Sequence, residues 1–216
     1  MGDYKGKLCE YSYTNKRDSV ELSKGEEISM NRMFSQSSSS DYVETIDITG
    51  LCNASDVTET LNQYPYWMQM YIPETLCIPA QKPDAESINA VNVSVNILRN
   101  EVINTPSSFP LANLEGKIVT GRKLIVEGQL CQLVEYTAND LEQSVHSAHF
   151  YVPFSAYIVV PETITFTLAN DTTITLDSLN VDFQVNACVE DLSVQLLDER
   201  TILKRVTLLV YAVPTQ

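Results

Sequence analysis

The two histidines of the chain, His146 and His149, are three positions apart in the segment QSVHSAHFYVPFSAYIVVP (143–161). Histidine binds metals and transfers protons, so this spacing raises the question of a catalytic or metal site. From His149 onward the sequence is typical of a β-strand, on which residues three apart point to opposite faces. Val145, Ser147 and His149 would then share one face. We therefore expect both histidines to be structural; a turn at Ser147 would leave a metal site open.

Other patterns that carry chemistry are weak. The sequence has no third histidine for a common zinc set, no G-x-S-x-G element and no glycine-rich phosphate loop. The acidic pairs Glu190–Asp191 and Asp198–Glu199 lack the spacing of a calcium loop. We predict no metal, no cofactor and no enzyme activity, although a Ser–His–Asp or Cys–His arrangement of distant residues stays open.

Charge limits the kinds of partner. The chain carries 28 acidic and 14 basic side chains, a net charge of −14. Nucleic acids and anionic lipids are bound by Lys and Arg, so we predict no nucleic-acid partner and no direct membrane binding. The opening residues MGDYKGKLCEYSYTNKRD contain no apolar signal-peptide core, so we expect synthesis in the cytosol.

Composition divides the chain into two parts. Residues 1–41 hold isolated tyrosines, the basic stretches KGK and NKR, and the tract FSQSSSSD. Serine runs lack the side chains of a packed core. We predict an N-terminal arm over residues 1–41, which could contact neighbouring subunits, followed by one domain over residues 42–216.

Alternation of apolar and polar residues dominates the predicted domain. It predicts strands with one buried and one exposed face near residues 91–97, 163–168, 173–177 and 179–186. Residues 123–136 and 201–213 are apolar on both faces, which is typical of central strands.

Two local features interrupt this pattern. Gly128 suggests a bulge or tight bend, and residues 82–91 could hold one or two helical turns. The fold class we predict is all-β, an antiparallel β-sandwich or jelly-roll-like double sheet.

Aromatic residues gather in the segment YPYWMQMYIPE (64–74), which includes the only tryptophan. Tyr64, Tyr66, Trp67 and Tyr71 are the candidate interaction patch. An ordinary core strand is the favoured interpretation, and a platform for sugar or a partner subunit is the alternative.

Four segments together resemble a known family. Residues 74–103, ETLCIPAQKPDAESINAVNVSVNILRNEVI, resemble the opening of the SPOCS domain, in which an IPxxKPD segment precedes a strand. Residues 121–136, 143–161 and 189–213 are similar to later blocks of that family, in the same order. The resemblance covers roughly residues 70–213.

The SPOCS domain occurs in proteins associated with the spore coat of endospore-forming bacteria. The resemblance implies a non-enzymatic role in assembly, synthesis in the mother-cell cytosol and a final place on the spore surface. The family's coat adaptors usually continue into a LysM domain; the sequence ends at Gln216, directly after the last similar block, so we expect no such domain here.

Three functions follow as hypotheses. The first is a structural subunit of a spore surface layer or appendage, which self-assembles through strand or arm contacts with copies of itself and with other coat proteins. The second is a monomeric adaptor that recruits a coat protein. The third is a carbohydrate-binding β-sandwich.

The five cysteines form no C-x-x-C pair, and reduced thiols acting as small apolar residues are the simplest interpretation. Cys131 and Cys188 lie in strand patterns and are expected to be buried. Cys9 lies in the predicted arm. In an oxidising setting it could form an intersubunit disulfide with Cys52 or another exposed thiol.

Overall fold

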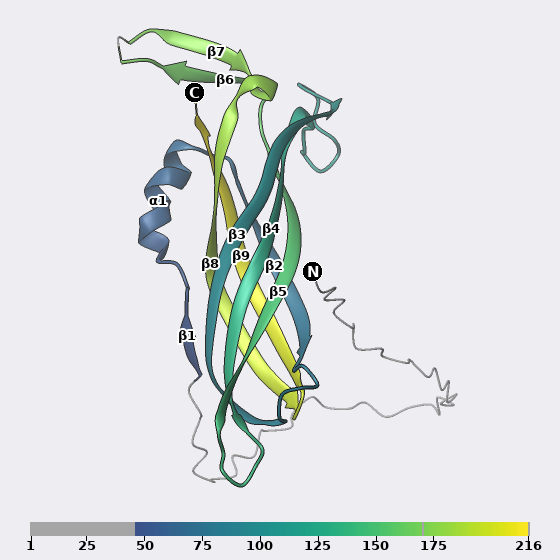
Figure 1. Ribbon diagram of the computed structural model, residues 1–216. Coiled ribbons are helices and arrows are strands. Elements are labelled where there is room, and N and C mark those ends of the chain that lie inside the picture. The colour runs from purple at the N-terminus through teal and green to yellow at the C-terminus, as the bar shows by residue number, and fades with distance from the viewer. Residues whose placement is uncertain (1–45, 170, 216) are drawn as a thin grey trace, which may run out of the picture. The chain divides into compact units, whose positions relative to one another are not determined.

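The computed structural model describes residues 46–169 and 171–215, most of which lie in β-strands (Figure 1). The predicted arm of residues 1–41 lies outside the described residues, so it stays a prediction. The elements are β1 (Asp47–Thr49), α1 (Ala54–Gln63), β2 (Trp67–Cys77), β3 (Ala85–Ser107), β4 (Thr120–Ala138), β5 (Val145–Val159), β6 (Thr163–Thr167), β7 (Thr173–Asp177), the 3-10 turn η1 (Ser178–Asn180), β8 (Asp182–Asp198) and β9 (Thr201–Thr215).

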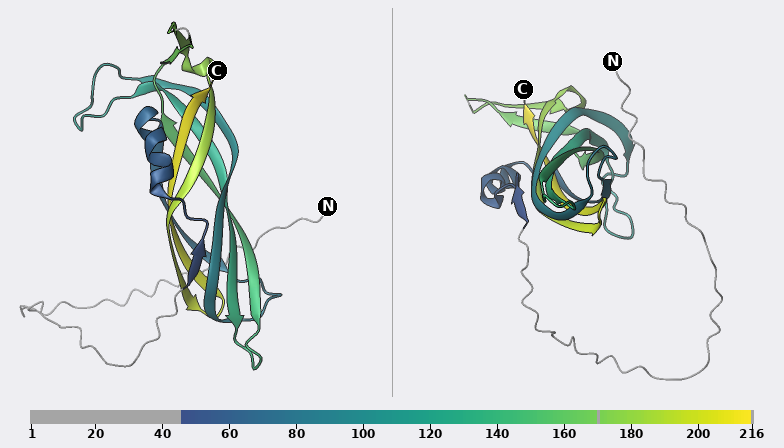
Figure 2. Two further views of the ribbon diagram at one scale, coloured as in Figure 1. Left: turned by 90° about the vertical axis from the view of Figure 1, so that its left-hand side faces the viewer. Right: turned by 60° about the horizontal axis from the view of Figure 1, so that its bottom comes forward.

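Two long sheets make up the body of the fold. The first sheet has the order β1-β3-β4-β5, and the second has the order β2-β9-β8. Their long strands pair antiparallel, and the short β1 pairs with β3 in parallel. β3 runs beside β8 and β2 beside β5, so the sheets curl around one interior, as Figure 2 shows. The prediction of an all-β antiparallel double sheet is confirmed.

The core lies between the inward faces of the two sheets. β4 and β9 are the central strands, as their two-sided apolar sequences predicted. Their inward side chains are fully buried: Leu124, Val126, Leu130 and Val134 of β4 face Ile202, Val206, Leu208 and Val210 of β9 in one apolar cluster. This cluster fixes the direction in which every other side chain of these strands points.

Gly128 marks an irregularity, as its position in the sequence indicated. β3 bulges between Ile97 and Arg99, directly opposite Gly128 on β4. Gly128 faces inward, and the ring of Phe154 on β5 covers it: a Cβ on Gly128 would lie 2.3 Å from Phe154 Cζ. Glycine is needed here to make room for the aromatic ring.

The predicted helical turns within residues 82–91 are wrong, because β3 begins at Ala85. Two bulges, between Ala85 and Ser87 and between Ile88 and Ala90, each add a residue to β3. Buried positions therefore recur every three residues, at Ala85, Ile88 and Val91, which imitates a helical period.

The helix of the described chain is α1, in a segment where the sequence predicted none. Asn53 caps it by accepting a hydrogen bond from the Ser55 N–H (3.3 Å), and Asp56 lies in its first turn. These are ordinary helix-start signals that could have located it. In the part of the chain that the structure describes, no helix is long and apolar enough to cross a bilayer.

Candidate functional site

The two histidines lie on opposite faces of β5, as predicted. His149 pairs with Leu133 on the exposed outer face of the first sheet, and His146 pairs with Tyr136. They cannot converge on one ion. Among residues 46–169 and 171–215 no group of three potential metal ligands comes together.

His146 belongs to a short polar chain in the β4–β5 turn. The hydroxyl of Ser144 lies 3.1 Å from His146 Nε2 and 3.1 Å from the Asp140 carboxylate. Since a carboxylate only accepts, Ser144 donates to Asp140 and the histidine ring donates to Ser144. In a nucleophilic triad the histidine lies between the serine and the carboxylate and accepts the serine proton. Here the serine lies in the middle and donates its proton to the carboxylate, so the histidine does not act as its base. The contact shapes the turn.

The IPxxKPD motif forms the KPD loop, residues 78–84, which wraps around Arg200 in the β8–β9 turn. The guanidinium donates to the carbonyls of Ile78 (3.1 Å), Pro79 (2.8 Å) and Lys82 (3.2 Å) and forms an ion pair with Asp84. The motif was evident in the sequence, whereas the role of Arg200 was not. Its only local signal was a basic residue in the turn LDER.

The same end of the sandwich holds a buried tyrosine. The hydroxyl of Tyr136 donates to the Pro83 carbonyl (3.1 Å), and its ring stacks on His146 with centroids 6.0 Å apart. Burial raises the pKa of Tyr136, so the hydroxyl keeps its proton and remains a donor. Tyr136 and Arg200 thus both hold the KPD loop.

A buried polar trio joins the two sheets: Lys204 of β9, Glu74 of β2 and Gln132 of β4. Lys204 is 1% exposed and forms an ion pair with Glu74 beside it in the second sheet. From the first sheet, Gln132 Nε2 donates to the same carboxylate (3.4 Å). Burial lowers the pKa of Lys204. The trio crosses the core and fixes how the sheets face each other.

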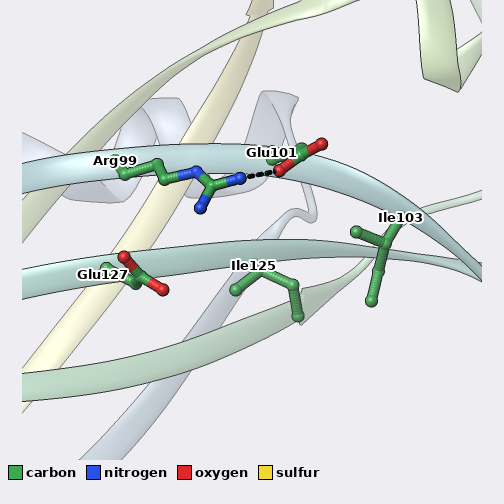
Figure 3. Close-up of a pocket in the computed structure, with 5 residues that line it drawn as sticks. All are labelled: Arg99, Glu101, Ile103, Ile125 and Glu127. Atoms are coloured by element: carbon green, nitrogen blue, oxygen red, sulfur yellow. Dashed lines mark hydrogen bonds and ion pairs between the residues drawn. The ribbon is translucent and has the colours of Figure 1, made fainter.

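A shallow pocket of about 130 Å³ lies on the outer face of the first sheet, next to the bulge of β3 (Figure 3). It is lined by Arg99, Glu101 and Ile103 of β3 and by Ile125 and Glu127 of β4. Arg99 pairs with Glu101 along the strand, as the dashed line in Figure 3 marks, and both side chains are more than half exposed.

The structure divides the candidate patch of Tyr64, Tyr66, Trp67 and Tyr71. Tyr66 faces the core, where its ring meets Phe183 edge-on and burial raises its pKa. Tyr64 caps the C-terminus of α1. Trp67 and Tyr71 lie on the outer face of β2, 46% and 58% exposed. A role for these two in binding stays a prediction.

One group of exposed apolar side chains in the described part of the chain was not predicted. It lies in the end loop, residues 108–119, between β3 and β4. Its large apolar side chains are 42% to 108% exposed: Phe109, Leu111, Leu114, Ile118 and Val119. The loop nevertheless has a defined shape. Asn113 Oδ1 accepts from the N–H groups of Glu115 and Lys117 (2.9 Å each), and Ser108 Oγ accepts from Val119 N–H (3.0 Å).

Cys52, a predicted partner of Cys9, forms a different disulfide in the structure. Cys52 forms a disulfide with Cys188, with Cα atoms 5.5 Å apart, because its N–H donates to the Val189 carbonyl (3.0 Å) and so places it beside β8. Its sulfur is therefore not available to Cys9, which lies outside the described residues. Cys188 is buried, as expected, whereas Cys131 is half-buried and free.

At the end opposite the KPD loop, Arg122 of β4 contacts the Asp177 carboxylate (3.2 Å). The same carboxylate accepts from the Leu179 N–H (2.9 Å) as the cap of η1. The hydrogen bond from Leu179, together with Arg122, lowers the pKa of Asp177 below 3.8.

This lowered pKa predicts an acid-sensitive contact. The stabilisation is present above 3.8, the ordinary value, and is lost as pH falls through the folded-state pKa. Asp177→Asn keeps the helix cap but not the charge. When the pH falls from about 5 to about 3, the free energy of unfolding in urea should therefore decrease less for this variant than for the wild type. An equal loss in both proteins would contradict the assignment.

Comparison with known proteins gives one finding. A family model described as SipL, SPOCS domain matches residues 84–197, more than half of the chain. The match runs from Asp84 of the KPD loop through β8, a narrower range than the resemblance suggested, and it confirms that resemblance. No curated protein and no solved structure matches the chain.

Proposed function

Because the chain belongs to the SipL, SPOCS domain family, whose match supports a spore-associated role, we propose that it is a non-enzymatic structural subunit of a bacterial spore surface layer or appendage. It is made in the mother-cell cytosol and assembles on the spore with copies of itself and with other coat proteins. The family is not known for enzymes, which agrees with this role.

The observation that carries the proposal is the end loop. Monomeric proteins rarely expose many large apolar side chains in one loop, and such groups usually mark contacts with other proteins. The hydrogen bonds of Asn113 and Ser108 hold the loop in shape before any partner arrives, which lowers the entropy cost of binding.

The opposite end also exposes apolar side chains. Leu141 and Val145, in and after the β4–β5 turn, are 106% and 64% exposed. The 19 residues of β4, at about 3.3 Å each, separate this turn from the end loop by about 60 Å. Figure 1 shows the turn and the loop at opposite ends of the sandwich. A contact between two different ends is head-to-tail, and such a contact propagates into a fibre unless its rotation closes a ring.

Negative-stain electron microscopy of the full chain tests the proposal. We expect fibres or sheets from the wild type and dispersed particles from the end-loop variant Phe109→Ser/Leu111→Ser/Leu114→Ser. The matched control is Trp67→Ala/Tyr71→Ala, which removes exposed aromatic side chains from another face and should still assemble. Dispersed particles from all three proteins would overturn the proposal and favour a monomeric adaptor.

The predicted arm is tested in the same way. If arm contacts contribute, a chain without residues 1–41 should form fewer or shorter assemblies than the full chain. Unchanged assemblies would remove the arm from the proposal and leave the end loop.

Carbohydrate binding is a second candidate because Trp67 and Tyr71 lie on one face of β2, four residues apart and both exposed. This spacing places their Cα atoms about 13 Å apart along the strand, and exposed aromatic rings offer flat apolar faces for stacking. If the wild-type protein is retained on immobilised spore glycan and Trp67→Ala is not, carbohydrate binding is supported. If the wild type is not retained, this candidate function is wrong.

A further inference from the structure

The segment of residues 46–63, which we call the β1–α1 segment, is attached to the sandwich at a few defined points. Asp47–Thr49 pair in parallel with residues 90–92 of β3, and Asn92 Nδ2 donates to Thr49 Oγ1 (2.8 Å). Cys52 then bonds to Val189 through its backbone and to Cys188 through its sulfur.

The surface that receives this segment fits it closely. Gly50 has a φ of +94°, and a Cβ on it would lie 1.8 Å from the Val93 carbonyl oxygen of β3. On the outer face of the second sheet, the neighbouring residues Cys188 and Leu209 are 4% and 3% exposed, although both lie outside the main core cluster. The sandwich therefore carries a built site for the β1–α1 segment.

The helix packs outside the main core, with Val57 and Leu61 half-buried. Ile46 and Ile48 pack against the core, but none of the described side chains of α1 does. α1 lies on the outside of the strands, as Figure 2 shows. The strand pairing, the Asn92–Thr49 hydrogen bond and the disulfide of the segment lie in residues 47–52.

The connection to the rest of the fold is short. After α1, the first residue bonded to the long sheets is Tyr66, just before β2. Its carbonyl accepts a hydrogen bond from the Ala212 N–H of β9 (2.8 Å). Between α1 and this point lie only Tyr64 and Pro65, and the proline keeps Tyr64 extended, with φ −125° and ψ 101°. A short hinge beside an element with its own defined contacts favours exchange of that element between copies.

We propose that the β1–α1 segment is exchanged between copies of this protein. In the exchanged form, β1 of one copy pairs with β3 of a second copy, and Cys52 bonds to Cys188 of that copy. Each contact made within one chain is available between two, because donor segment and receiving surface are identical in every copy. This inference rests on the proposed self-assembly and supplies a covalent link for it.

The bond forms by thiol–disulfide exchange with an oxidant such as oxidised glutathione. The thiols of Cys52 and Cys188 lose two electrons and two protons, their sulfurs join, and the glutathione disulfide breaks into two reduced thiols.

Isotope mixing tests the exchange. Light and ¹⁵N-labelled full-length chains are mixed in equal amounts under reduction in denaturant, refolded together and oxidised with oxidised glutathione. Mass spectrometry then identifies the Cys52–Cys188 peptide. If exchange is complete, about half of this peptide should join a light and a heavy chain. Peptides that are all light or all heavy would overturn the inference.

The variant Gly50→Ala shows whether the linkage depends on the receiving site. Its Cβ would strike β3, so we expect the mixed-isotope peptide to fall severalfold. An unchanged amount would mean unspecific thiol exchange and would also overturn the inference. Electron microscopy of the same samples separates the two proposals: fibres without mixed peptides support only self-assembly, and closed dimers with mixed peptides support only the exchange.

Discussion

Glu74→Gln is expected to destabilise the sandwich by about 3–5 kcal/mol, because it leaves the ammonium of Lys204 buried without a counter-charge. Lys204 is 1% exposed, and Glu74 is its ion-pair partner. Urea unfolding followed by circular dichroism measures the change. A loss below about 1 kcal/mol would mean that the pair behaves like a surface salt bridge.

A matched variant separates charge from packing. Glu74→Leu/Gln132→Leu/Lys204→Met replaces the whole trio with apolar residues and should be about as stable as the wild type, or more stable. One oxygen of Glu74 and the amide oxygen of Gln132 are buried without a hydrogen-bond partner, so the trio is imperfectly satisfied. A loss as large as that of Glu74→Gln would show that the cost comes from packing.

The lowered pKa of Lys204 adds a pH test of the same trio. Between the folded-state pKa and the ordinary value of 10.5, the unfolded chain binds more protons at this position than the folded chain. The contribution of Lys204 to the free energy of unfolding therefore rises with pH in that range. Relative to Lys204→Met, the wild type should gain stability as pH increases there, and a fall would contradict the burial effect.

Arg200→Lys is expected to cost about 3 kcal/mol although it keeps the charge, because an ammonium cannot reproduce the planar fork of donors. The guanidinium serves three carbonyls of the KPD loop as well as Asp84. Without the guanidinium, carbonyls of the KPD loop lose their hydrogen-bond donor, and the loop is no longer held between β2 and β3. Hydrogen exchange at Ala85 N–H, which donates to the Glu199 carbonyl (2.7 Å), should speed up.

Arg205→Lys is the control for this substitution. Arg205 follows Lys204 on β9 and points to the outer face of the second sheet, where it is half-buried. Its replacement should change stability by less than about 0.5 kcal/mol. Equal effects at Arg200 and Arg205 would mean that the KPD loop is held by other contacts.

The two ends of the sandwich use their residues differently. At the KPD loop, Arg200, Tyr136 and the β4–β5 turn direct most of their polar groups toward one another. The end loop instead points its apolar side chains into solvent. The polar contacts stabilise the fold around the KPD loop, whereas the end loop, and Leu141 and Val145 at the opposite end, offer exposed apolar surface for association.

The sequence by itself determined the strands and the faces of their residues. Successive side chains of a regular strand point to opposite faces, so residues three apart do as well. His146 and His149 could therefore be assigned to opposite faces of β5 without a structure. Two-sided apolar sequence placed β4 and β9 at the centres of their sheets. The same rule failed over residues 85–91, where two bulges shift the period from two toward three.

Only the tertiary structure decided which distant residues meet. Arg200 and Asp84 are 116 positions apart, and Cys52 and Cys188 are 136 apart. Local periodicity records the face of a side chain, but contact also depends on strand order, register and the packing of one sheet on the other. The buried charge of Lys204 shows the difference: alternation along β9 puts it on the same face as Ile202 and Val206, but only the fold brings the carboxylate of Glu74 that makes its burial tolerable.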